Sequence, residues 1–172
     1  MDSMQLTHVL RSDRFTRPYF QGVFPSDCLR RLKPELPCAV VVNTDLSHSP
    51  GAHWVAVFIS KNGVGDFFDS YGLPPSTTAD IEKFLNRHCV QRQNNNVSLQ
   101  GLYSTVCGQY AVFFLLHRCR GIEMKQITGW FTRQPHSNDE MVNDFITRHF
   151  PCVNMPVYDL PFLKQLSTRR TF

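Results

Sequence analysis

The stretch that most constrains the fold is an apolar run, residues 111–116, that follows closely on Cys107 and Gly108. Its side chains are apolar at every helical position, so a helix formed here has no polar face and must be buried on all sides. Gly121 marks the expected end of that helix. Cys107 then stands at its positive end, where backbone amides and the helix dipole favour thiolate over thiol. The sequence therefore predicts a buried helix with a reactive sulfur at its head.

Two runs rich in β-branched and apolar residues, 38–42 and 53–60, predict central strands. Asn62-Gly63 has the chemistry of a hairpin turn and joins the second run to a partner strand over 64–69. Antiparallel pairing around this turn places position 53 opposite the low seventies. A bulge or an offset then brings the carboxylate of Asp69 beside His53.

The remaining segments complete an expected α+β fold, a small antiparallel or mixed sheet flanked by helices. Ser26 can cap a short helix over 27–32, and a second helix begins near residue 77 or 78. The polar stretch 91–96 predicts a surface loop, and 97–100 predicts a short strand. A capping box over 137–140 opens a last helix that Pro151 ends, and an irregular tail runs from Val153 onward.

Bulk properties indicate one globular domain over residues 1–172, with 42% apolar and 19% charged residues. We find no apolar run long enough to cross a bilayer and no basic region ahead of an apolar core near Met1, so we expect neither membrane insertion nor secretion. The formal charge of +4 is scattered along the chain. It is compatible with binding DNA but is better explained by a solvated surface of mixed charge.

Six cysteines occur without C-x-x-C spacing and without a histidine pair at zinc-finger distance, which argues against a structural metal site. With no secretory signal we expect free thiols. Cys38 and Cys119, which lie in apolar patterns, are expected to be small buried residues.

Four residues have the chemistry of a cysteine hydrolase. His53 can act as base and acid for the Cys107 thiol, and Asp69 can orient the imidazole and stabilise its charged form. The backbone N–H of Cys107 and the side-chain amide of Gln100 can donate to a developing oxyanion. Each signal alone is more often ordinary packing or a turn, and only the combination favours catalysis.

The order and spacing of these residues resemble the adenovirus-type cysteine endopeptidases (adenain family), in the same clan as the SUMO-specific proteases. The resemblance rests on four short motifs and covers roughly residues 15–117; the motifs are His53-Trp54, Phe68-Asp69-Ser70-Tyr71-Gly72, Gln100-Gly101 and Cys107-Gly108.

The resemblance implies a rearranged papain-like fold in which His53 is the general base, Cys107 the nucleophile and Gln100 the oxyanion-hole glutamine. Asp69 matches the acidic orienter, which is Glu in adenain and Asp in the SUMO proteases. Val106 stands where SUMO proteases usually carry Asp, which favours the viral type.

Two further positions match the family. Trp54 matches a tryptophan that packs beside the histidine and positions it. Cys89 falls where adenain has a cysteine that forms a disulfide with an activating viral peptide. An ordinary thiol at a helix end is an equal interpretation of Cys89.

The resemblance implies an endopeptidase that cleaves capsid or core precursors beside small residues, often glycine, in the host nucleus or the virion. Its implied cofactors are the activating viral peptide and DNA. Three alternatives stay open. The chain could be an isopeptidase acting on the Gly-Gly tails of ubiquitin-like modifiers, a non-catalytic binding module of the same fold, or a DNA-binding accessory protein.

Overall fold

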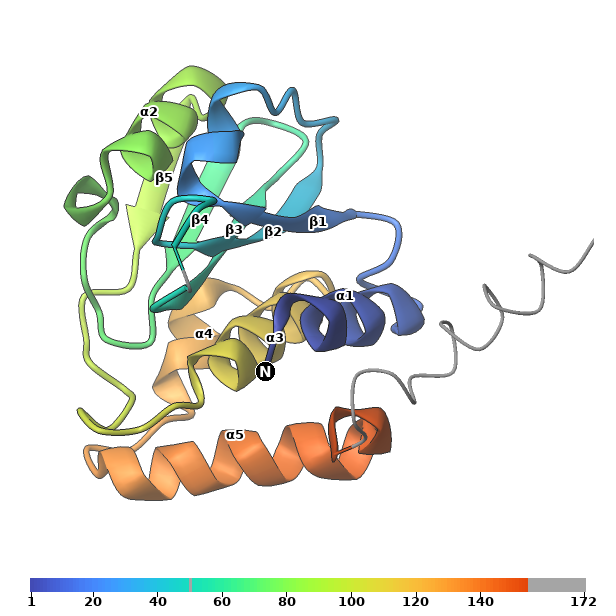
Figure 1. Cartoon of the computed structure of the whole chain (residues 1–172), viewed down its shortest axis with the longest axis vertical. Coiled ribbons are helices and arrows are strands. Elements are labelled where there is room, and N and C mark those ends of the chain that lie inside the picture. The colour runs from blue at the N-terminus through green and yellow to red at the C-terminus, as the bar shows by residue number, and fades with distance from the viewer. Residues whose placement is uncertain (50, 155–172) are drawn as a thin grey trace, which may run out of the picture.

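A five-stranded mixed sheet with the order β1-β2-β3-β4-β5 forms the centre of the fold (Figure 1). The computed structural model describes residues 1–49 and 51–154. The central pairs β2–β3 and β3–β4 are antiparallel, whereas β1–β2 and β4–β5 are parallel. This architecture confirms the expected α+β class with a mixed sheet. The strands are β1 (Phe20–Pro25), β2 (Cys38–Asn43), β3 (Trp54–Ile59), β4 (Val64–Phe68) and β5 (Gln91–Asn94).

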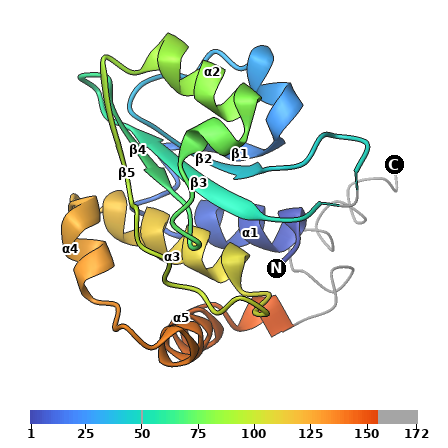
Figure 2. The ribbon, with the colours of Figure 1, turned by 90° about the vertical axis from the view of Figure 1, so that its left-hand side faces the viewer.

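Helices cover both faces of the sheet (Figure 2). One face carries α1 (Ser3–Ser12), α3 (Cys107–Arg118), α4 (Met124–Gly129) and α5 (Pro135–His149); the other carries α2 (Ala79–His88) and the 3-10 helix η1 (Ser26–Arg30). Two shorter 3-10 turns are η2 (Pro75–Thr77) and η3 (Pro151–Asn154).

The double coverage explains the unbroken apolar run of β2. Successive strand residues point to opposite faces, so Val41 joins the core under α3 while Val40 and Val42 join the core under α2. A strand buried on both faces needs apolar residues at every position.

Helix α3 is buried as its composition predicts. It packs on the sheet with α1 and α4 beside it and α5 on its outer side, and residues 110–116 are buried without exception. The ring of Phe114 stacks on that of Phe68 from β4, with centroids 4.6 Å apart. This packing fixes the head of α3 against the strands that carry the other candidate catalytic residues.

Several local predictions are wrong, each for an identifiable reason. Strand β5 lies inside the polar stretch that was expected to be a loop. All four of its residues are exposed, so it lacks the apolar alternation of a strand, and it is held by its backbone pairing with β4 and by the hydrogen bond from Gln93 to Asp66. Residues 97–100 form no strand. Helix α5 begins at Pro135 rather than at a capping box, because proline is well suited to the first helical position. Helices α1 and α4 and strand β1 were not predicted, and the tail beyond residue 154 lies outside the described residues.

Candidate active site

The hairpin β3–β4 brings together the predicted base and its orienter. Its register pairs Ala56 with Phe68, so continuing the ladder places His53 opposite Tyr71. The two rings are 4.8 Å apart between centroids. His53 Nε2 lies 2.8 Å from Asp69 Oδ1, and both side chains are almost fully buried. The predicted contact between His53 and Asp69 is therefore present.

Cys107 is the first residue of α3, and its sulfur is hydrogen-bonded to His53. Since Nε2 of His53 faces Asp69, Nδ1 is the ring nitrogen left for the sulfur. The backbone N–H groups of Trp54 and Gly108 also donate to the sulfur. These donors surround the thiol with groups that stabilise its ionised form.

The electrostatics of this pair favour an ion pair. Burial alone would raise the pKa of Cys107, but the hydrogen bond from His53 and the two backbone donors leave that pKa below its ordinary value. Burial alone would lower the pKa of His53, but Asp69 and Cys107 raise it to about 9. The two shifts act together to favour a thiolate beside an imidazolium, the form in which sulfur is nucleophilic.

Asp69 is itself held by its neighbours. Its Oδ1 accepts a hydrogen bond from the N–H of Tyr71 at 2.7 Å. The buried Asn95 clamps its backbone, accepting from the N–H of Asp69 at 2.8 Å and donating to its carbonyl at 2.6 Å. Asn95 belongs to the polar stretch for which a surface loop was predicted. Its role at the site was not predicted, because the neighbouring asparagines gave no signal that distinguished it.

Gln100 lies in the wall of the site, but its amide hydrogens are engaged. Its Nε2 donates to the carbonyl of Ser104 at 2.8 Å and to the Tyr71 hydroxyl at 3.3 Å. Its Oε1 accepts from Ser70 Oγ at 2.6 Å. For Gln100 to donate to an oxyanion, one of the two Nε2 hydrogen bonds must open. Tyr71 thus links Gln100 to His53, but the side-chain amide of Gln100 is not free to donate into the site.

Helix α5 anchors the segment that precedes the nucleophile, a contribution that the sequence did not indicate. Asp139 Oδ2 accepts from the N–H of Gly101 at 3.1 Å, and Oδ1 accepts from the Tyr110 hydroxyl at 2.9 Å. Asn138 donates to the carbonyl of Leu99 at 3.1 Å. Since Tyr110 lies one turn after Cys107, Asp139 links the Gln100 segment directly to α3.

Trp54 is held beside Cys107 by the N-terminal segment. Its indole N–H donates to the carbonyl of Met1 at 3.0 Å. A β-carbon placed on Gly108 would lie 3.1 Å from Met1 Cβ and 3.4 Å from Trp54 Cδ1. A larger residue after Cys107 would thus push Met1 by a few tenths of an ångström, and glycine avoids this crowding. Met1 and Trp54 also line a groove of about 490 Å³ that reaches Phe24 and Leu46.

Cys89 lies away from this constellation. It follows α2 at the opposite face of the sheet, and its side chain packs over Gly65 against the second core cluster. Burial raises the pKa of its thiol. These surroundings favour a packing role over a reactive one, and the disulfide with a peptide remains a prediction. Cys38 is fully buried, Cys119 is half-buried, and burial raises the pKa of each to about 12.

Two searches of the described residues were negative. Residues 1–49 and 51–154 contain no group of three or more His, Cys, Asp or Glu side chains arranged to hold a metal ion. None of the helices in the same part of the chain is both long enough and apolar enough to span a membrane.

No protein-family model matches the chain, but curated adenovirus proteases do. The chain is 27% identical over 112 residues to the protease of porcine adenovirus A serotype 3, covering 57% of this chain and 55% of the relative. It is 32% identical over 111 residues to the protease of bovine adenovirus 2, covering 57% and 54%. The chain spans about half the length of these relatives. It is a distant homologue of the adenovirus proteases, as the motifs predicted.

Solved structures share the fold. The chain matches the ASFV pS273R protease with a TM-score of 0.58 and 18% identity, over 80% of this chain and 63% of that one. It matches ChlaDub1 from Chlamydia trachomatis with a TM-score of 0.61 and 12% identity, over 94% and 93%. The second match spans nearly the whole of both chains, so the adenain-like fold is present.

Proposed function

We propose that this distant homologue of the adenovirus proteases is a cysteine endopeptidase with His53, Asp69 and Cys107 as its catalytic triad. The observation that carries the proposal is the chain of contacts from Asp69 through His53 to the sulfur of Cys107 at the head of α3. A non-catalytic module would have no need to keep an imidazole pKa raised and a thiol pKa lowered at one buried site.

In the proposed reaction the Cys107 thiolate attacks the scissile carbonyl carbon and forms a carbon–sulfur bond. The backbone N–H of Cys107 donates to the oxyanion, and Gln100 joins it once its amide leaves Ser104 or Tyr71. His53, as imidazolium, gives its proton to the leaving amine as the peptide bond breaks. The neutral His53 then takes a proton from water, whose oxygen attacks the thioester. The acid product leaves, and thiolate and imidazolium are restored.

The homology supports a viral substrate class. We propose precursor proteins of a capsid or core, cleaved beside small residues such as glycine, with action in the host nucleus or in assembling particles. The ring of Tyr71 lies against the ring of His53, with centroids 4.8 Å apart, which supports a preference for small residues next to the scissile bond.

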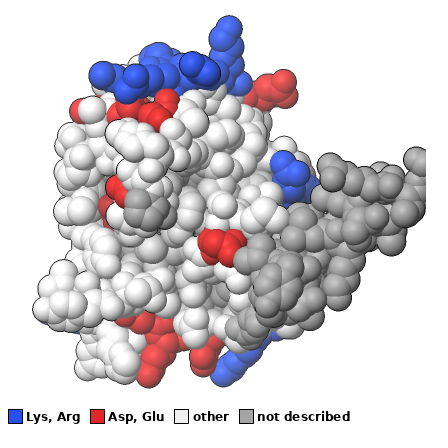
Figure 3. All heavy atoms as spheres, viewed as in Figure 1, with Lys and Arg blue, Asp and Glu red and all other residues white. Residues whose placement is uncertain are grey.

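We also propose that DNA and an activating viral peptide act as cofactors. Figure 3 shows Lys and Arg side chains gathered at the end of the molecule formed by η1 and α2. The residues concerned are all exposed: Arg30, Arg31, Lys33, Lys83 and Arg87. They could contact phosphates without sequence preference. Asp80, which pairs with Arg30 at 3.0 Å, offsets part of this charge.

Replacing the nucleophile tests the proposed activity. Cys107→Ala should remove all cleavage of a Gly-containing peptide library and all labelling by a thiol-reactive substrate analogue, while the melting temperature stays within a few degrees. Cys28→Ala is the matched control, because Cys28 is an exposed free thiol outside the site, and it should cleave normally.

The library should be run with and without duplex DNA and reducing agent, beside probes that carry ubiquitin-like modifiers. These conditions separate the remaining hypotheses. Cleavage of the modifier probes alone would assign the chain to the isopeptidases. Full cleavage by Cys107→Ala would end the assignment to cysteine proteases.

A further inference from the structure

Two loops beside the β3–β4 hairpin, residues 69–74 and 95–106, expose bulky apolar side chains. Leu73, Val97, Leu102 and Tyr103 are 46%, 57%, 77% and 95% exposed. They are four of the nine large apolar side chains that are exposed in the described part of the chain. Exposing apolar groups this fully on one region marks it as a place where another molecule binds.

The two loops are joined to each other by hydrogen bonds and close packing. The N–H groups of Leu99 and Gln100 both donate to the carbonyl of Ser70, at 2.8 and 3.1 Å. Gly72, with φ of +70°, lies so close to the backbone of Val97 that a β-carbon would clash with it. The Tyr71 hydroxyl lies 3.4 Å from the carbonyl of Ser104. The four apolar residues therefore sit on a preformed support, which lowers the entropic cost of binding.

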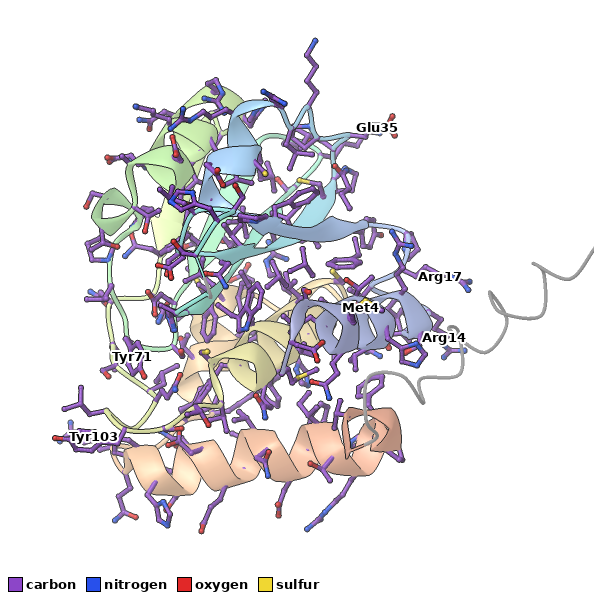
Figure 4. The ribbon with its side chains drawn as sticks, viewed as in Figure 1. Met4, Arg14, Arg17, Glu35, Tyr71 and Tyr103 are labelled. Atoms are coloured by element: carbon purple, nitrogen blue, oxygen red, sulfur yellow. The ribbon has the colours of Figure 1, made fainter. Side chains whose placement is uncertain are left out.

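The loops that carry the four apolar residues are linked through Tyr71 to His53. Tyr71 contacts the His53 ring on one side and the Ser104 carbonyl on the other. Figure 4 shows Tyr71 and Tyr103 on the same side of the molecule, with Tyr103 projecting outward from the loop that precedes α3. A polypeptide that passes the sulfur of Cys107 on this side would meet the apolar residues next.

The region is also uncharged. The sequence has no Asp, Glu, Lys or Arg over residues 70–79 or 93–117. In the space-filling view the part of the surface formed by these loops is correspondingly free of charged side chains (Figure 3). The carboxylate of Asp139, which adjoins the loop 95–106, is already engaged by the N–H of Gly101 and the hydroxyl of Tyr110. A charged occupant would therefore lose hydration without gaining a free partner, so the complementary occupant is apolar.

We propose that Leu73, Val97, Leu102 and Tyr103 form a docking surface for an uncharged, apolar segment of the protein substrate that lies several residues from the scissile bond. This proposal rests on the proposed protease function and adds to it a selection beyond the residues next to the cleaved bond. Burying two such side chains against an apolar segment should improve KM by about tenfold or more.

The test compares Leu102→Ser/Tyr103→Ser with the wild type and with Val90→Ser. Val90 is the matched control, because it is 88% exposed but lies beside Gly63 at the far end of the hairpin. Two long Gly-Gly peptides serve as probes. One carries Leu and Phe and the other carries Lys and Glu, in both cases four to eight residues from the scissile bond on either side. A short Gly-Gly peptide without these extensions is the third probe, and the rate of Cys107 alkylation by iodoacetamide reports on the site itself.

For the wild type and Val90→Ser we expect a KM about tenfold lower with the apolar long peptide than with the charged one. In Leu102→Ser/Tyr103→Ser that advantage should vanish, while the short peptide and the alkylation rate stay unchanged. An advantage that survives in the double variant overturns the docking surface but leaves the protease standing. A change in the oligomeric state of the double variant without a change in KM also overturns the docking surface, because it would assign these residues to self-association. If the wild type cleaves none of the probes or library peptides, both proposals fail together.

Discussion

Two cysteines at opposite ends of two helices show how their surroundings shift the pKa of a thiol in opposite directions. Cys107 opens α3 and Cys89 follows α2, and both side chains are half-buried. The pKa of Cys107 is lowered, whereas that of Cys89 is raised. Exposure is similar, so it does not explain the difference. The partners explain it, because Cys107 meets an imidazole and two backbone N–H groups at a helix N-terminus, and Cys89 meets apolar packing at a C-terminus.

The largest expected effect comes from removing the imidazole. His53→Ala should lower kcat/KM by about 10³-fold, because both proton transfers lose their carrier. It should also return the Cys107 thiol to ordinary reactivity, so that the two cysteines become alike. Peptide cleavage and iodoacetamide labelling measure the two effects. His88→Ala, which removes the histidine beside Cys89, should leave cleavage intact; an equal loss in both variants would mean that His53 acts only through stability.

A smaller effect should separate the two thiols by pH. Since a lowered pKa keeps the thiolate at more acidic pH, Cys107 should be alkylated at pH 6 at least about tenfold faster than Cys89. Cleavage should persist into the same acidic range. It should fall as pH rises through about 9, where His53 loses the proton that the leaving amine needs. Mass spectrometry of peptides after timed labelling measures both thiols at once, and equal rates at pH 6 would contradict the comparison.

The smallest effect should come from the hydrogen bonds that Asp139 of α5 accepts from Gly101 and Tyr110. These contacts have no counterpart beside Cys89. Asp139→Asn weakens the link between Gly101 and Tyr110, so kcat should fall by about five- to tenfold with little change in KM. Tyr110→Phe should reproduce part of this loss. Asp144→Asn on the same helix removes only an exposed ion pair with Arg148 and should change neither constant. A loss of melting temperature in proportion to activity would reduce Asp139 to a structural residue.

The sequence predicted the structure best in segments where a single interaction determines the local fold. The all-apolar run after Gly108 could only be a buried helix, and the Asn62-Gly63 turn fixed a register that places His53 near Asp69. Strand β5 could not be predicted, because its exposed polar side chains show no apolar alternation and its pairing with β4 depends on contacts that form only in the folded sheet. Asn95 and Asp139 could not be predicted either, since each acts through backbone N–H groups that become neighbours only when distant segments pack.

The contact between Gly108 and the first residues of the chain has a mechanical consequence. Met1 and Trp54 occupy the space where any larger residue after Cys107 would project. The first turn of α3 is thereby wedged between the N-terminal segment and the start of β3. Enlarging residue 108 would therefore displace the N-terminal segment rather than leave it in place, so the position of Met1 and the position of the Cys107 sulfur are linked through the same few atoms.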